Sequence, residues 1–147
     1  KKFMQVIGFN FTKISAEKAT EIKKPNINTK IEFTDLENEK VDLLKDSEEP
    51  VKVSFQYNLS YQNSEEKTEK KSAEIIFNGK ITLALNKAEA KNISKSWKKR
   101  ELPNEIKIPL FNLILRRCTS KALSLQDEIG LPFHVPIPRV STRREQS

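Results

Sequence analysis

Few residues of this sequence could carry out covalent or metal chemistry. His134 is the only histidine and Cys118 the only cysteine, and no tight cluster of acidic residues accompanies either. Because a metal site needs several such ligands together, we interpret His134 as a polar residue of an extended segment and Cys118 as a packed thiol. The glycines Gly8, Gly79 and Gly130 lie too far apart to form a phosphate-binding loop. We therefore expect no enzymatic activity, no cofactor and no metal.

The net charge of +7 raises the question of polyanion binding. Basic residues are densest at Lys98–Arg100, at Arg116–Arg117 and in the C-terminal stretch with Arg139, Arg143 and Arg144. Trp97 stands beside the first group and could stack on a base, although such a tryptophan more often anchors its own helix. Lysines and glutamates alternate through most of the chain, which is typical of a solvated surface. Nucleic-acid or ribosome binding is therefore the alternative hypothesis rather than the first.

The 147 residues predict one domain, residues 1–147. A single cysteine permits no internal disulfide and fits a reducing compartment. No apolar run approaches the roughly 18 residues of a membrane span, and the first residues lack the apolar core of a signal peptide. We expect a cytoplasmic protein without membrane insertion.

Alternating apolar and polar residues predict strands at residues 3–14, 27–44, 51–61 and 73–85. The pattern is strictest in residues 51–61, where odd positions are apolar and even positions are polar, so one face of the sheet should be wet. Gly79 lies inside the last strand and indicates a bulge or the close approach of another segment.

Two helices are expected after the strands. Asn86 and Glu89 form a capping pattern for a helix at residues 87–100. Pro109 suits the first position of a longer helix, and Gly130 suits its end. The apolar stripe expected on that helix comprises Phe111, Ile114, Leu115, Cys118, Ala122, Leu125 and Ile129. The order of elements predicts an α+β fold, in which a four-stranded antiparallel sheet (3–85) carries two C-terminal helices (87–129) on one face, followed by an extended basic tail (130–147).

More apolar side chains are present than this arrangement needs for its core, and a large exposed apolar surface usually serves binding. The candidates for binding another polypeptide are Leu110, Leu113, Leu123, Leu131, Phe133, Val135 and Ile137. The candidates for a contact between subunits are Met4, Val6 and Ile76 on the second sheet face, with Ile93 and Trp97 on the first helix. Which of the two groups meets a sister subunit is left open.

Residues 108–140 resemble the last helix and tail of the SecB family of protein-export chaperones, and in particular its archaeal SecB-like branch. The matching features are a long helix ending at a glutamate and Gly130, then Leu131-Pro132, then Pro136-Ile137-Pro138. The order of strands and helices also matches over residues 3–140. The resemblance implies dimers or tetramers that hold unfolded polypeptides without ATP, in apolar grooves beside the last helix and the sheet.

Two departures from the family restrict what the resemblance implies. Family members that act in bacterial export are acidic, whereas this chain is basic, and its terminus lacks the cysteine and histidine ligands of the zinc-linked tail that binds the export motor. A general holdase for non-native polypeptide clients is the first hypothesis, and a link to protein export rests on the resemblance alone. A nucleic-acid-binding protein and an oligomeric scaffold for one dedicated partner are the other two.

Overall fold

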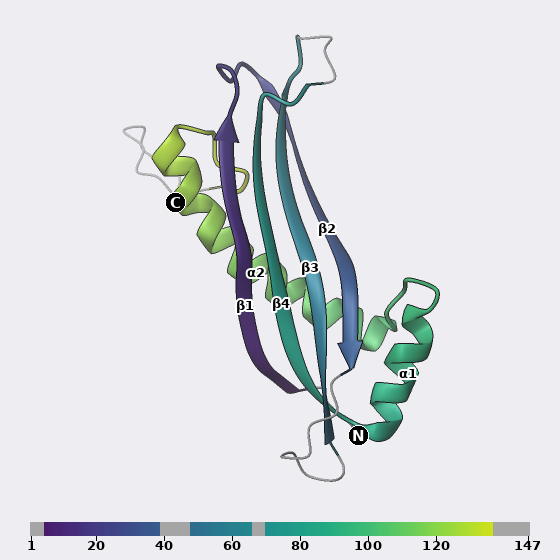
Figure 1. Ribbon diagram of the computed structural model, residues 1–147. Coiled ribbons are helices and arrows are strands. Elements are labelled where there is room, and N and C mark those ends of the chain that lie inside the picture. The colour runs from purple at the N-terminus through teal and green to yellow at the C-terminus, as the bar shows by residue number, and fades with distance from the viewer. Residues whose placement is uncertain (1–4, 39–47, 66–69, 137–147) are drawn as a thin grey trace, which may run out of the picture.

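Four antiparallel strands form one sheet in the computed structural model, which describes residues 5–38, 48–65 and 70–136. The strands are β1 (Gln5–Lys18), β2 (Pro25–Asn38), β3 (Glu48–Asn63) and β4 (Ala73–Asn86), in the spatial order β1-β4-β3-β2. The helices α1 (Lys87–Trp97) and α2 (Asn104–Ile129) follow. Figure 1 shows α2 running diagonally behind the sheet, from the foot of β2 to the upper part of β1, with α1 beside the foot of β2. The predicted fold class is confirmed.

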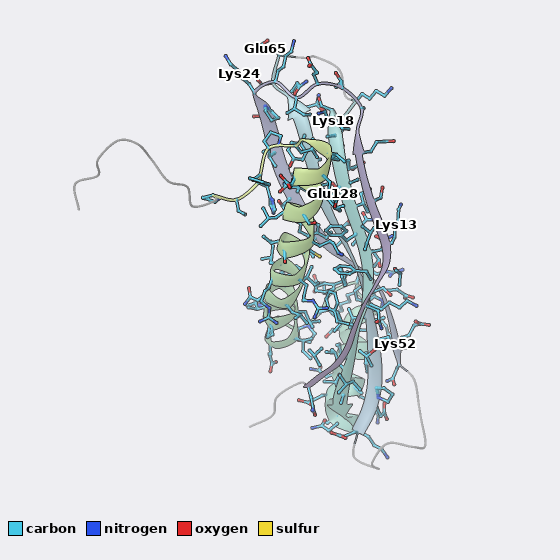
Figure 2. All side chains as sticks on the ribbon, turned by 90° about the vertical axis from the view of Figure 1, so that its left-hand side faces the viewer. Lys13, Lys18, Lys24, Lys52, Glu65 and Glu128 are labelled. Atoms are coloured by element: carbon cyan, nitrogen blue, oxygen red, sulfur yellow. The ribbon has the colours of Figure 1, made fainter. Side chains whose placement is uncertain are left out.

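The alternation in β3 separates a helix-facing side of the sheet from an open side. Val53, Phe55 and Tyr57 are fully or almost fully buried, whereas the residues between them are partly exposed. On the open side, polar residues bond across the strands: Gln56 Nε2 donates to Asn78 Oδ1 over 3.0 Å and Asn58 Nδ2 to Glu74 Oε2 over 2.8 Å. Lys13 and Lys52 project from this side, away from α2 (Figure 2).

β1 departs from simple alternation because its pairing with β4 shifts register between Val6 and Gly8 and again between Phe11 and Lys13. Each shift inserts an extra residue and reverses which side the following residues face. Because the first shift lies between Val6 and Phe9, these two residues face the same side although they are three apart. Val6 pairs with the core residue Leu83 and faces the helices. The expectation that Val6 lies on the second sheet face is wrong for this reason.

Gly79 marks a close approach, as expected. It pairs with Phe11 on one side and Phe55 on the other. A Cβ atom at this position would lie 2.5 Å from Phe55 Cζ and 2.8 Å from the carbonyl oxygen of Asn10. The absent side chain makes room for the ring of Phe55 in the core.

The connection from β1 to β2 crosses the end of the sheet, since these strands occupy opposite edges. Two buried polar residues hold it. Asn63 Oδ1 accepts from the backbone N–H of Lys23 over 2.9 Å, and Asn63 Nδ2 donates to the carbonyl oxygen of Glu21 over 2.8 Å. The carbonyl oxygen of Ser72 accepts from the N–H of Ala19 over 2.8 Å.

The helix ends follow local rules at most positions. Asn86 and Glu89 form the predicted capping box of α1, with Glu89 N donating to Asn86 Oδ1 over 2.7 Å. Gly130 ends α2 in a left-handed conformation with φ of 70°, as predicted. The predicted start of α2 is wrong, because the helix begins at Asn104 and Pro109 lies inside it. There the proline removes one intrahelical hydrogen bond near the start, which costs less than a break at the centre of the helix.

Candidate functional site

α2 presents two different sides to solvent, because its diagonal path leaves sheet surface uncovered on both. The residues buried beneath it follow a spacing of four, namely Leu110, Ile114, Cys118, Ala122 and Gln126. Relative to the predicted stripe, the helix is rotated about its axis, so Leu115 is exposed while Leu110 is fully buried. This rotation decides which side chains are available for binding.

The side of α2 that faces β2 presents mainly apolar side chains, together with Lys107, whose Nζ lies 5.8 Å from the ring centroid of Phe111. Ile108, Phe111 and Leu115 lie on this side because residues three and four apart share a helix face. The ring of Phe111 stacks on Phe33 of β2, with centroids 5.1 Å apart and an interplanar angle of 8°. Ile108 is 56% exposed and Leu115 is 41% exposed. We call Ile108, Phe111 and Leu115, together with Phe33, the apolar flank.

The predicted client-binding residues divide into three groups. Leu110 and Leu131 are buried in the core, so the expectation that they are exposed is wrong. Leu110 belongs to the buried stripe, and the left-handed turn at Gly130 folds Leu131 back onto the sheet. Leu113, Leu123 and Val135 are half-buried and Phe133 is exposed, so they stay predictions, and Ile137 lies outside the described residues.

The predicted subunit contacts also divide. Ile93 is fully buried between α1 and the sheet of its own chain, so it has no exposed surface to offer. Trp97 is partly buried against the same core, and the guanidinium of Arg100 lies 5.2 Å from its ring centroid. Ile76 is partly exposed on the open side of the sheet, Val6 is exposed on the helix-facing side, and Met4 lies outside the described residues.

A buried polar network fixes the segment after α2 against β3. Gln126 Nε2 donates to Tyr61 Oη over 2.6 Å and lies 3.0 Å from His134 Nδ1. Tyr61 Oη donates to the carbonyl oxygen of Pro132 over 2.6 Å, and Tyr57 Oη lies 3.2 Å from His134 Nε2. We call Tyr57, Tyr61, Gln126, Pro132 and His134 the tail clamp. It places Leu131–Pro136 on the same side of α2 as the apolar flank, next to β3.

Burial sets the protonation of these groups. Desolvation raises the pKa values of Tyr57 and Tyr61 above that of an ordinary tyrosine, so both are neutral phenols. Desolvation lowers the pKa of His134 below 6.5 and favours the neutral imidazole. Protonation would turn Nδ1 into a donor facing the Gln126 amide nitrogen, which already donates. Among the described residues, Gln126 Oε1 has no hydrogen-bond partner, although it is buried.

Cys118 lies in the buried stripe, where desolvation raises the pKa of its thiol to about 12. The thiol is therefore protonated near neutral pH and is not a nucleophile. Over residues 5–38, 48–65 and 70–136 the structure gathers no set of three or more potential metal-ligating side chains. None of the helices in these ranges has the length and apolar character to span a membrane.

Sequence reasoning missed the tail clamp. The sequence pattern indicates for His134 only a polar residue in an extended segment, and it assigns Gln126 no role. A signal was present, since Gln126 continues the spacing of four from Leu110 and its amide must therefore enter the core.

The chain was compared with family models, curated proteins and solved structures, and only the solved structures gave a match. No protein-family model matches the chain, and no curated protein matches it in sequence. Among solved structures, the chain is similar to the SecB-like chaperone Rv1957 of Mycobacterium tuberculosis, solved in complex with a ChAD peptide from the Rv1956 HigA1 antitoxin. The TM-score is 0.53 at 12% identity, covering 96% of this chain and 93% of the other. The fold is SecB-like. The match spans nearly the full length of both chains, in agreement with the order of strands and helices over residues 3–140.

Proposed function

We propose that this protein is an ATP-independent holdase that binds non-native polypeptide segments beside α2. The observation that carries the proposal is the apolar flank, where Ile108 and Leu115 stand exposed next to the Phe33–Phe111 stack on a SecB-like fold. Exposed apolar side chains arranged along a helix beside a sheet offer a surface on which an extended apolar segment loses contact with water.

The solved neighbour supports a polypeptide as the ligand, because that chaperone was captured with a peptide. Transferred to this chain, the binding site is the apolar flank together with the half-buried Leu123 and the adjoining residues Phe133 and Val135. Leu113, four residues before Arg117, adds apolar surface on the side of α2 that faces β1. Apolar burial supplies the affinity, so binding to a neutral segment should change little with ionic strength.

Further parts of the proposal are a homodimer or homotetramer and a cytoplasmic location. Ile76, partly exposed on the open side of the sheet, supports a contact between subunits. A link to protein export and membership of the archaeal SecB-like branch rest on the sequence resemblance alone.

The test is a light-scattering assay of chemically denatured citrate synthase, diluted into buffer with this protein at equimolar ratio. We expect aggregation to be slowed without ATP, and the protection to persist at high salt. Unchanged aggregation at every ratio would exclude the holdase function. Light scattering of the protein alone, and with the client, gives its oligomeric state in the same series.

Binding of nucleic acid is the second candidate function, and the exposed cations Arg116 and Arg117 on α2 favour it. Filter binding of single-stranded RNA separates the two, because nucleic-acid affinity falls steeply with salt through counterion release. Failure to bind RNA near 100 mM salt would remove this candidate.

A further inference from the structure

The side of α2 that faces β1 differs from the apolar flank. An open cleft of about 680 Å³ lies there, lined by Phe11 of β1 and by five residues of α2. Those five are Arg116, Arg117, Ser120, Lys121 and Ser124. We call Arg116, Arg117 and Lys121 the basic flank.

The floor next to the basic flank is apolar. The register of β1 places Val6, Phe9, Phe11 and Ile14 opposite Leu83, Ile81, Gly79 and Phe77, so all four point to the helix-facing side. Val6 is 39% exposed and Ile14 is 47% exposed, because α2 does not cover the edge strand along its whole length. We call these four residues the β1 strip. It offers contact area to aliphatic and aromatic side chains alike.

The basic flank carries three positive charges that no described residue pairs with. Arg116, Arg117 and Lys121 are exposed, and none of them forms an ion pair with a described residue. Elsewhere lysines are paired, as in Lys80–Glu37 at 3.7 Å and Lys71–Glu74 at 2.7 Å. Between Glu105 and Asp127, α2 contains basic residues and no acidic one. A ligand with carboxylates would supply the missing partners.

Resting on the proposed holdase function, we propose that the cleft between the basic flank and the β1 strip selects client segments that carry both acidic and apolar side chains. In an extended segment, alternate side chains point to opposite sides. One set can then lie on the β1 strip while the other places carboxylates against Arg116, Arg117 and Lys121. Arginine can hold a carboxylate through two parallel hydrogen bonds, which adds geometry to charge.

The aromatic rings in the floor favour polypeptide over nucleic acid. Phe9 and Phe11 contact each other edge to face at 5.2 Å, and Phe9 and Phe55 lie 5.4 Å apart. The guanidinium of Arg117 lies 4.6 Å from the ring centroid of Phe9 and covers one of its faces. Stacking of bases needs open ring faces. Arg117 already covers one face of the Phe9 ring, so little of that ring is open for stacking with a base. Val6 and Ile14 are aliphatic and have no ring to stack.

The test uses three labelled peptides of about twelve residues, which span ~40 Å when extended, comparable to the length of β1. They share the same leucine and phenylalanine positions and carry glutamate, glutamine or lysine at the alternate positions. We expect fluorescence anisotropy at low salt to show the glutamate peptide binding roughly tenfold tighter than the lysine peptide, because several exposed ion pairs of modest strength add. The difference should shrink as salt rises, whereas binding of the glutamine peptide should not.

A charge-reversed variant, R116E/R117E/K121E, should prefer the lysine peptide. Its matched control, K91E/K95E/K98E, reverses three exposed lysines beside a different cleft on α1 and should keep the wild-type order. Because Arg117 packs on Phe9, a neutral variant, R116Q/R117Q/K121Q, accompanies them, and it should bind all three peptides equally. Circular dichroism melts establish that each variant is folded.

The outcomes separate the two proposals. Equal affinity of wild type for the three peptides, with aggregation of citrate synthase still suppressed, would overturn the acidic preference and leave the holdase function standing. A single-stranded RNA that displaces the glutamate peptide and binds tighter than it, with both lost in the charge-reversed variant, would assign the cleft to nucleic acid. A change of oligomeric state in that variant, with unchanged peptide order, would assign the cleft to a second copy of the chain. Absence of both peptide binding and aggregation suppression would remove the proposed function itself.

Discussion

The two sides of α2 rest on the same core and differ in what they show to solvent. Toward β2, the apolar flank presents Ile108 and Leu115 beside a stacked aromatic pair. Toward β1, exposed Arg116, Arg117 and Lys121 stand over an apolar strip. We therefore expect the affinity of the apolar flank for a ligand to change little with salt concentration. The affinity of the basic flank should fall as the salt concentration rises. A holdase built in this way could hold many sequences on one side and discriminate by charge on the other.

The largest expected effect comes from a cavity in the core beneath α2, because this core positions both the apolar flank and the basic flank. Leu110→Ala should lower the free energy of unfolding by about 2–5 kcal/mol, because Leu110 is fully buried beneath α2. The matched change Leu115→Ala, at an exposed position of the same helix, should leave stability within about 0.5 kcal/mol. Urea titrations of both variants measure the difference. Equal stability of the two would contradict the orientation of α2.

Gly79→Ala should destabilise by about 1–3 kcal/mol, since an added Cβ would press on the ring of Phe55 and on the backbone of β1. Both sides of α2 share this part of the core, so client binding on both should weaken together once the protein begins to unfold. Thermal melts give the loss. A Gly8→Ala variant, whose added Cβ would meet Thr82 Oγ1 at 3.3 Å, is the milder control.

The apolar flank can be weakened by itself. Ile108→Ser with Leu115→Ser removes two exposed apolar side chains and should reduce affinity for the uncharged glutamine peptide roughly fivefold, with little change in stability. The preference for glutamate over lysine should survive, because the basic flank is intact. Ile76→Ser, on the open side of the sheet, is the matched control: light scattering reads any change in its oligomeric state, and its affinity per protomer should equal that of wild type. Loss of the charge preference in the double serine variant would show that the two sides do not act separately.

Mild acid should act on the side of α2 that carries the tail clamp. His134 has a pKa lowered by burial, so the unfolded or undocked segment takes up a proton first as pH falls below 6.5. Docking of residues 131–136 should be constant above that pH and should weaken progressively below it, until the folded-state pKa is passed. Amide hydrogen exchange of this segment, corrected for intrinsic rates, measures the change. His134→Gln cannot titrate and should flatten the profile, and an unchanged slope in this variant would assign the pH effect to another group.

Sequence patterns predicted the elements well where local rules decide. The alternation of β3, the capping box at Asn86 and the αL end at Gly130 depend on neighbours in sequence, and all three are confirmed. The start of α2 was predicted five residues late, at Pro109 instead of Asn104, because Pro103 also offers a start and the choice depends on packing of the first turn.

The candidate site was harder to predict, since it depends on tertiary geometry. The rotation of α2 that buries Leu110 and exposes Leu115 follows from its diagonal crossing, which the sequence does not encode locally. The bulges of β1 moved Val6 to the helix-facing side in the same way. The sequence marks Arg116 and Arg117 as a basic pair, but their position over an aromatic floor depends on the fold.

The most direct test of the account is site-specific photo-crosslinking to a permanently unfolded client, reduced and carboxymethylated α-lactalbumin. A benzophenone side chain is placed at Ile108 on the apolar flank, at Ser120 in the basic cleft, or at Glu32 on the open side of the sheet. The account predicts crosslinks from Ile108 and Ser120 and none from Glu32. Crosslinks from Glu32 alone, or from no position while the client is held soluble, would contradict it.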